Sequence, residues 1–333
     1  MRRSHVTARP ILAFAAIVWM LGASVPRAEV SWSQEVRARV FKLLTEGIKA
    51  YKEGRPKEAI PLLSDAADVA LNSFTAYYYL GLALKADRQY ERAIEPLQIA
   101  IELEPVNLQA RVALADCYLK HGEPAEALAE YHRVIARQAD YAPAWDGLGR
   151  AAESGGDDEE AVKNYRKAID LNPGFPDAAL NLGDLLLRHG RHTEAIDLFL
   201  KAIKVRPDFA AAYNRLGVAY ADQRLYNEAI AALRQAESLE KGNPWHPVTI
   251  GGIFMQLDSL VEAGRELEAA LALDPDYLEG YLGKSSLQRR RGDLEGAVTT
   301  LDAGLARVVE DERTMAMLRE RRAQIVAENA RMN

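Results

Sequence analysis

Small apolar residues recur along the chain at a constant interval of 34 residues. Alanine occupies eight successive positions of this register, and another small residue recurs seven positions after each alanine, from Ala66 to Gly304. Residues seven positions apart lie on one face of an α-helix. Each unit is therefore predicted to contain a helix with a shallow apolar stripe. The eight alanines are Ala59, Ala93, Ala127, Ala161, Ala195, Ala229, Ala263 and Ala297.

A second small residue, usually glycine, lies twelve positions before each alanine, as in Leu148-Gly149 and Leu182-Gly183. Two helices approach closely only where no long side chain separates their backbones, so each unit is predicted to be a helix pair. Prolines at multiples of the same interval end the units, and glycines mark the turn within each unit. These residues are Pro105, Pro173, Pro207 and Pro275, and Gly54, Gly122, Gly155, Gly156, Gly190 and Gly292.

The unit that starts at residue 142 contains Trp145, Leu148, Gly149, Ala161, Tyr165, Ala168 and Pro173. This pattern resembles the tetratricopeptide repeat family, whose units have about 34 residues. The resemblance implies an all-α fold, a right-handed superhelical α-solenoid of helix-turn-helix repeats with a concave inner surface. Eight units are expected at 40–73, 74–107, 108–141, 142–175, 176–209, 210–243, 244–277 and 278–311, followed by a capping helix and tail at 312–333.

The expected capping helix is amphipathic. Its residues Met315, Leu318, Ile325 and Val326 are predicted to face the repeats, and Arg319, Arg321 and Arg322 are predicted to point outward.

The N-terminus has the pattern of an export signal. A basic segment precedes an uncharged run from Ile11 to Val25, which is shorter than the roughly 20 residues of a membrane span. Residues 1–28 are interpreted as a signal peptide that is removed between Ala23 and Glu29, with an uncleaved membrane anchor as the alternative. Residues 29–39 then lead into the repeats. The repeats are expected to be exported, either periplasmic or secreted, or to be membrane-anchored facing the periplasm.

Charge and cysteine content exclude several classes of protein. The formal net charge is −6, and beyond residue 28 the chain has 38 basic and 48 acidic residues. Such a surface repels phosphate backbones and anionic lipids, so no nucleic-acid partner is expected, and a membrane contact is expected only through the N-terminal segment. The single cysteine, Cys117, excludes a disulfide-stapled or cysteine-ligated zinc fold. It is predicted to be a buried, inert thiol.

The family resemblance implies a binding groove formed by the first helix of each unit. Tyrosine and tryptophan in the groove offer contact area, and Arg150, Asn181 and Arg215 are expected to offer directional hydrogen-bond donors to a peptide. Solubility and packing between neighbours are expected to account for about half of the groove residues named below. The expected groove residues are Tyr78, Tyr79, Leu82, Lys85, Asp116, Leu119, Asp146, Arg150, Glu153, Asn181, Asp184, Asn214, Arg215 and Trp245.

Some members of the family hold a chaperone's C-terminus with a carboxylate clamp, which is not expected here. Of the clamp residues only Asn181 and Arg215 match, and the other places hold Asp146, Arg150 and Ala211. An aspartate where the clamp needs a lysine repels a ligand carboxylate.

Two further motifs have competing interpretations. His189 and His192 have a metal-site spacing, but no further ligand is near them and a solvated turn is favoured. The run Arg289-Arg290-Arg291 either attracts an acidic partner or complements the dipole at a helix C-terminus, and the second interpretation is favoured.

The segment around residues 241–252 departs from the repeat pattern. Lys241 replaces the usual turn proline, and Pro247 replaces a bulky core residue and is expected to delay the start of the helix. Gly251-Gly252 is expected to interrupt that helix, because each interior glycine costs about 1 kcal/mol. A loosened joint between the sixth and seventh units is predicted.

The leading hypothesis is a non-enzymatic adaptor that docks a peptide or protein subunit within an exported envelope assembly. The sequence shows no phosphate-binding loop, nucleophile elbow or paired catalytic acids, so no catalytic residue, cofactor or metal is expected. A membrane-tethered organiser of an envelope complex, with an uncleaved N-terminal anchor, is the alternative. A role as an accessory to an enzyme is the third hypothesis.

Overall fold

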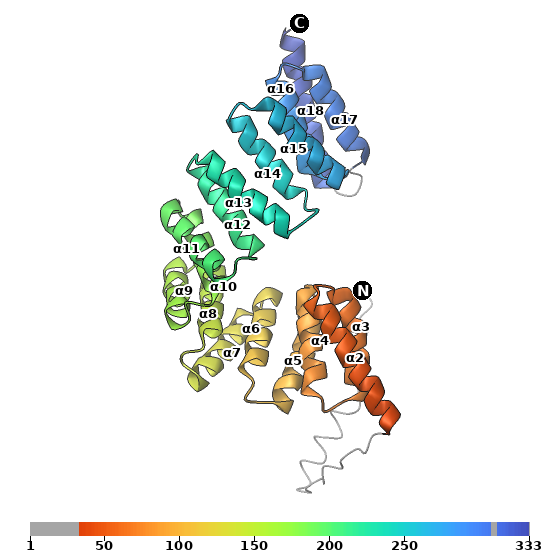
Figure 1. The fold of residues 1–333 in the computed structure, drawn as a ribbon, viewed down its shortest axis with the longest axis vertical. Helices are drawn as coiled ribbons and strands as arrows, with labels where there is room; N and C mark the ends of the chain where they lie inside the picture. The colour runs from red at the N-terminus through yellow and green to blue at the C-terminus, as the bar shows by residue number, and fades with distance from the viewer. Residues whose placement is uncertain (1–32, 308–311, 333) are drawn as a thin grey trace, which may run out of the picture.

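The computed structural model describes residues 33–307 and 312–332, and Figure 1 shows their helices stacked along a curved path. This part of the chain contains helices and short connections but no strand. The helices are α2 (Gln34–Lys52), α3 (Pro56–Val69), α4 (Phe74–Ala86), α5 (Tyr90–Leu103), α6 (Leu108–His121), α7 (Pro124–Arg137), α8 (Ala142–Ser154), α9 (Asp158–Leu171), α10 (Pro176–Arg188), α11 (His192–Val205), α12 (Ala210–Asp222), α13 (Tyr226–Leu239), α14 (Trp245–Gln256), α15 (Leu260–Leu273), α16 (Leu278–Arg290), α17 (Leu294–Arg307) and α18 (Glu312–Met332).

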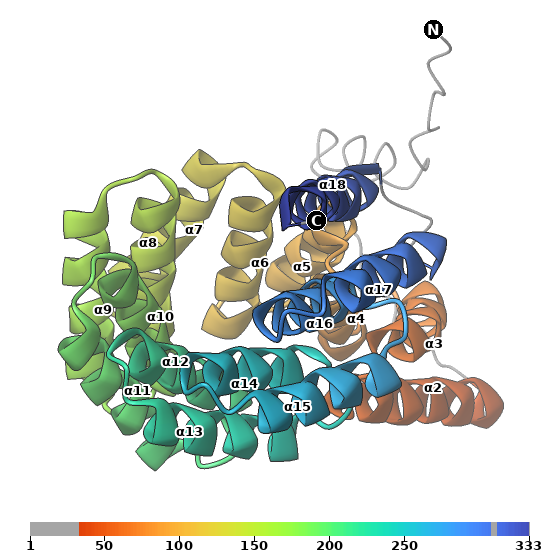
Figure 2. The same ribbon diagram turned by 90° about the horizontal axis from the view of Figure 1, so that it is seen from above.

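The helices pack as pairs, each pair contacting the next. Successive even-numbered helices also contact one another, as α4 does with α6 and α8 with α10. Figure 2 shows the even-numbered helices from α6 to α16 on the inside of the curve and their odd-numbered partners outside. The molecule is thus an all-α solenoid of helix pairs, which confirms the predicted fold class.

The small residues lie where the two helices of a pair meet. All eight alanines of the register are completely buried. A Cβ atom added to Gly149 would lie 2.5 Å from the ring of Tyr165, and one added to Gly183 would lie 2.5 Å from the ring of Phe199. The predicted close approach of the two helices is therefore confirmed. The alanines of the second helix are buried, and a bulky side chain of the second helix fills the space that each glycine of the first helix leaves.

The turn within each pair has a repeated backbone conformation. Gly54, Gly122, Gly156, Gly190 and Gly292 all have positive φ. Three residues with side chains, Arg88, Arg224 and Asp258, occupy the equivalent positions in the remaining pairs and also have φ near +60°. The left-handed turn is therefore imposed by the packing of the pair, since it occurs even where the residue disfavours it.

Helix α14 differs from the prediction for its segment. It begins at Trp245, two residues before Pro247, and continues without a break through Gly251 and Gly252. The expectation of an interrupted helix was therefore wrong. Gly251 is buried, and an added Cβ would meet the Leu267 side chain at 3.2 Å, so it fills the same close-packed role as the glycines of the other pairs.

Helix α18 also corrects an expectation. Leu318 and Ile325 are buried as predicted, but Val326 is exposed. Arg321 and Arg322, which were expected to point outward, contact the preceding pair: Arg321 donates to the Ser286 hydroxyl at 3.3 Å, and Arg322 forms an ion pair with an aspartate of α17. The helix thus uses arginines as well as apolar residues to cover the end of the solenoid.

At the other end, α2 starts at Gln34, so it includes most of the segment expected to lead into the repeats. The expected export signal at 1–28 lies outside the described residues. None of the described helices combines the length and apolar character that crossing a bilayer requires.

Candidate functional site

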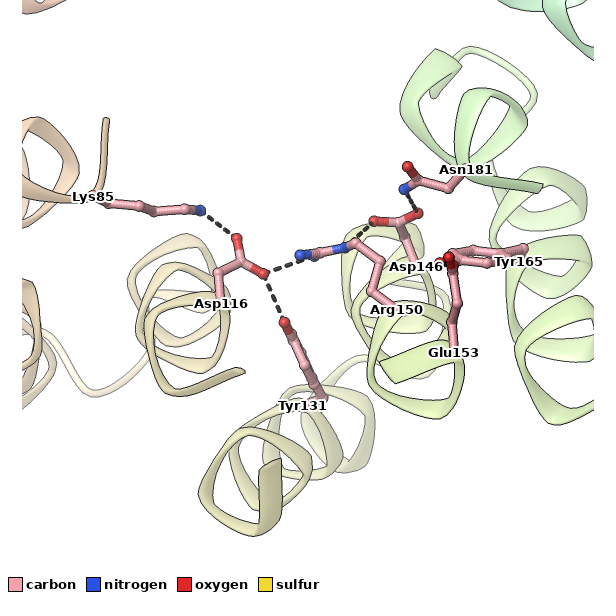
Figure 3. A network of polar contacts seen from close by, with 8 residues as sticks. All are labelled: Lys85, Asp116, Tyr131, Asp146, Arg150, Glu153, Tyr165 and Asn181. Carbon is pink, nitrogen blue, oxygen red and sulfur yellow. Dashed lines mark hydrogen bonds and ion pairs between the residues drawn. The ribbon is translucent and has the colours of Figure 1, made fainter. Parts of the chain in front are cut away.

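The inner surface of the solenoid carries a network of polar side chains that spans five helix pairs. Figure 3 shows its centre, where residues from α4, α6, α8 and α10 point toward one another. The linked residues are 31, 34 or 35 positions apart, because residues separated by about one repeat lie next to each other on stacked inner helices.

Asp116 on α6 is the centre of the network. Its Oδ1 atom accepts hydrogen bonds from the Tyr131 hydroxyl at 2.6 Å and from Arg150 Nη2 at 2.7 Å. Its Oδ2 atom accepts a hydrogen bond from Lys85 Nζ. The residue is only 7% exposed, so these three donors replace the water that a carboxylate needs.

Arg150 extends the network to α10. Its Nε atom donates to Asp146 Oδ2 at 3.0 Å, and Asn181 Nδ2 donates to Asp146 Oδ1 at 2.8 Å. Asp146 is 4% exposed. Two buried carboxylates thus share one guanidinium, and Arg150 holds the third, fourth and fifth helix pairs in register.

The two carboxyl groups differ in their protonation energetics. Burial raises the pKa of Asp116, but the nearby Arg150 and Lys85 outweigh burial and hold the pKa well below its usual value. Burial, together with the nearby charge of Asp116, raises the pKa of Asp146 by more than Arg150 and Asn181 lower it. Asp116 is therefore the charge on which the network depends, and Asp146 is the less well compensated group.

A second set of polar contacts continues along the inner surface. Glu153 accepts hydrogen bonds from the Tyr165 hydroxyl at 2.6 Å and from Arg188 Nη2 at 2.5 Å. Arg215 lies 2.9 Å from Asp184 Oδ1, and burial raises the pKa of Asp184 more than Arg215 lowers it. An open cavity of about 470 Å³ in the centre of the inner surface is bordered by Glu153, Tyr165, Asp184 and Arg188.

An aromatic cluster lies at the N-terminal end of the inner surface. The Tyr78 ring stacks on Phe74 at 5.2 Å and meets the edge of Tyr79 at 5.4 Å, and Tyr79 meets Tyr51 at 5.9 Å. All four side chains are partly buried, and burial raises the pKa of Tyr78 to about 12. Leu82 is a partly buried apolar residue of the same part of the array, whereas Leu119 belongs to the neighbouring apolar cluster of α6, α7 and α8.

The structure changes the role of several expected groove residues. Arg150, Asn181 and Arg215 were expected to offer free donors to a ligand, but each donates to a carboxylate of the protein itself. Asp116 and Asp146 lie beneath the surface rather than on it. The reason is that helices on the inside of the curve lie close enough for opposite charges to pair between neighbours.

Asn214 and Trp245 contact a residue that the sequence analysis missed. His246 is completely buried, its Nε2 atom lies 3.0 Å from Asn214 Oδ1, and its ring is 5.4 Å from that of Trp245. The sequence held a signal for His246, because the five preceding units have alanine at the equivalent position, from Ala76 to Ala212. Tyr51 and Phe74 were also missed, although Tyr51 lies one repeat before Lys85.

Cys117 behaves as expected, whereas of the two histidines His189 is exposed and His192 is partly buried. Cys117 is completely buried, and burial raises the pKa of its thiol to about 12. His189 is half exposed and lies 2.7 Å from Asp158, and His192 lies 3.8 Å from Asp222. Within the described residues no three histidine, cysteine or acidic side chains gather as a metal site would require.

Comparisons with known proteins agree with this architecture. Residues 44–244 match the tetratricopeptide repeat family in five overlapping segments, 44–106, 81–143, 112–176, 147–204 and 180–244. Human Superkiller complex protein 3 is 29% identical over 106 residues, which are 32% of this chain but only 7% of that protein.

Two solved structures share the fold. A chain in the crystal structure of the APC/C hetero-tetramer Cut9–Hcn1 aligns with a TM-score of 0.58 at 17% identity, over 84% of this chain and 55% of that chain. PilW, a type IV pilus biogenesis factor, aligns with a TM-score of 0.55 at 18% identity, over 63% of this chain and 98% of PilW. At these identities the likeness concerns the solenoid alone.

Proposed function

The chain belongs to the tetratricopeptide repeat family, and we propose that it is a non-enzymatic scaffold that binds a peptide or protein subunit along its concave inner surface. The observation that carries this proposal is the aromatic cluster of Tyr51, Phe74, Tyr78 and Tyr79 on that surface. Partly buried aromatic side chains supply large contact area at little entropic cost, which is why they dominate protein-binding sites.

The ionisable groups of the inner surface support a binding role rather than a catalytic one. Asp116, Asp146, Glu153 and Asp184 each pair with an arginine or lysine of the protein. Such pairing occupies the hydrogen-bond donors of these arginines and of the lysine, so the network forms a rigid, charge-balanced part of the inner surface. A partner then gains affinity from the aromatic end and the open central cavity.

We further propose that the solenoid has eight repeats and that α18 caps them. The family match ends at residue 244, but the helix pairs α14–α15 and α16–α17 keep the 34-residue spacing and its buried alanines, Ala263 and Ala297. Leu318 and Ile325 of α18 then cover the apolar end of the last pair, as a solenoid requires for solubility.

The site of action proposed for this scaffold is an exported, envelope-associated assembly. The uncharged run from Ile11 to Val25 after a basic segment supports export, and the shared fold with the pilus biogenesis factor PilW is compatible with it. The alternative is a membrane-tethered organiser with an uncleaved anchor. The mass of the mature chain separates the two, because cleavage between Ala23 and Glu29 removes the apolar run.

A crosslinking experiment in the native envelope tests the scaffold. Replacing Tyr78 and Tyr79 with serine is expected to reduce the yield of the captured partner at least fivefold, while helix content measured by circular dichroism stays unchanged. The matched control replaces Leu200 and Val261 with serine; both are exposed residues on second helices. If the control reduces capture as much as the tyrosine variant does, the partner does not bind at the aromatic cluster.

A further inference from the structure

A second cavity, of about 720 Å³, lies at the C-terminal end of the solenoid between α16 and α18. Arg289, Arg321 and Arg331 line it, with Glu328, Gln324 and Ile325 among them. Its volume lies within the range of sites that hold a few amino-acid side chains or a small ligand.

This cavity continues the inner surface. Arg289 lies six repeats after Lys85 and four repeats after Glu153, at the same position of the inner helix. Both of those residues belong to the inner network. A partner that follows the concave surface toward its C-terminal end therefore reaches the cavity.

The three consecutive arginines at the end of α16 have separate roles. Arg290 donates to the Met255 carbonyl at 2.5 Å and pairs with Asp258 at 3.1 Å, and Arg291 donates to the Leu260 carbonyl. These two arginines thus attach α16 to the preceding pair. Arg289 instead turns toward α18, so complementing the helix dipole does not account for the whole run.

The cavity has more positive than negative charge. Arg289 donates to Glu328 at 2.6 Å, but Arg321 donates, among the residues that the structure describes, only to the neutral Ser286 and Gln324 side chains, each at 3.3 Å. No described carboxylate lies within 4.0 Å of the Arg321 or Arg331 guanidinium. In the central network, by contrast, each guanidinium has a carboxylate partner.

We propose that this cavity binds an acidic peptide segment of a partner protein, with Arg321 and Arg331 pairing with its carboxylates. Guanidinium groups bind carboxylates with two parallel hydrogen bonds, and a partly enclosed site strengthens them. A protein segment fits better than a nucleic acid, because a short acidic segment places its few carboxylates within the cavity. An extended phosphate backbone also runs over the rest of a chain that, beyond residue 28, has ten more acidic than basic residues and repels it. This site does not depend on the aromatic cluster.

Fluorescence anisotropy with the full chain tests the proposal, using fluorescein-labelled hexaglutamate as the probe and hexaglutamine as the neutral control. The chain is expected to bind hexaglutamate, more weakly as salt rises, and to leave hexaglutamine unbound. The double variant Arg321→Gln with Arg331→Gln should weaken hexaglutamate binding at least tenfold. The matched variant Arg37→Gln with Arg39→Gln removes two exposed charges at the opposite end and should change it less than twofold.

Several outcomes overturn the proposal. Equal weakening by both double variants would mean that only the overall charge matters, and equal binding of hexaglutamine would remove the role of charge. Tighter binding of a single-stranded oligonucleotide or of phosphatidylglycerol vesicles would assign the cavity to a different partner. If the double variant fails to fold, Arg331→Gln alone serves, with an expected loss of at least threefold. The tyrosine variant of the aromatic cluster should bind hexaglutamate normally, so failure of the scaffold proposal is distinguishable.

Discussion

Replacing Gly147 with alanine is the sharpest test of how the fold supports the inner network. Gly147 lies in α8 against the completely buried ring of Tyr131, and an added Cβ would lie 2.7 Å from Tyr131 Cδ1 and closer still to two other ring atoms. The ring cannot move freely, because its hydroxyl is held by Asp116 at 2.6 Å. The extra methyl group must therefore displace the ring and disturb that hydrogen bond.

The size of the effect follows from three opposing contributions. Overpacking costs about 1–3 kcal/mol and the weakened hydrogen bond to a charged acceptor about 1.5 kcal/mol, whereas alanine in a helix gains about 1 kcal/mol over glycine. The expected net loss in unfolding free energy is about 1–4 kcal/mol. The matched control is Gly252→Ala, since Gly252 is also inside a helix but has no atom within 4 Å of an added Cβ. It should gain up to about 1 kcal/mol.

Urea unfolding followed by circular dichroism at 222 nm measures both variants. The same chemical change should move the transition midpoint in opposite directions at the two positions. If Gly147→Ala is as stable as the unmodified chain while Gly252→Ala is stabilised, the contact with Tyr131 does not restrict this position, and the argument that glycine is required by close packing fails.

Three further predictions concern the turns, the network and the joint. Arg88→Gly and Arg224→Gly should each raise the unfolding free energy by about 0.5–1 kcal/mol, seen as a higher urea midpoint, because glycine adopts positive φ without strain. Because the folded-state pKa of Asp116 is depressed, its charge stabilises the fold above a pH of about 4, and this contribution is lost as the pH falls further. The variant Asp116→Asn should therefore be less stable than the unmodified chain at pH 7. Its urea midpoint should also decline less between pH 5 and pH 3. Amide hydrogen exchange tests the predicted loosened joint between the sixth and seventh units. If the joint is loose, the Gly251 amide should exchange faster than the Gly183 amide.

Much of the candidate site was predictable as a set of positions but not as a set of contacts. The repeat register placed Lys85, Asp116 and Arg150 on the inner helices, where the structure has them. It did not show that Asp116 and Arg150, 34 residues apart, neutralise each other. The distance between stacked helices decides whether opposite charges pair or remain available to a ligand, and that distance depends on the packing of every unit in between.

Residues outside the expected surface were harder to find. Tyr131 and Tyr165 belong to second helices and were not among the expected groove residues, yet their hydroxyl groups reach the inner carboxylates. An aromatic ring that spans the pair buries its carbon atoms and carries a hydrogen-bond donor to the far side. The repeat pattern of the sequence does not predict that a side chain of a second helix contacts the inner surface.

The sequence alone determined that this chain is a solenoid of helix pairs, because the interval of 34 residues and the small residues at fixed places leave one way for neighbouring helices to bury their apolar faces. It also determined where most turns fall, since proline and glycine act locally on the backbone. Only the tertiary structure decided which charged side chains form ion pairs within the protein and which, like Arg321 and Arg331, have no described carboxylate partner. Pairing depends on distances between helices, and those arise from the sum of many packed contacts rather than from any single residue.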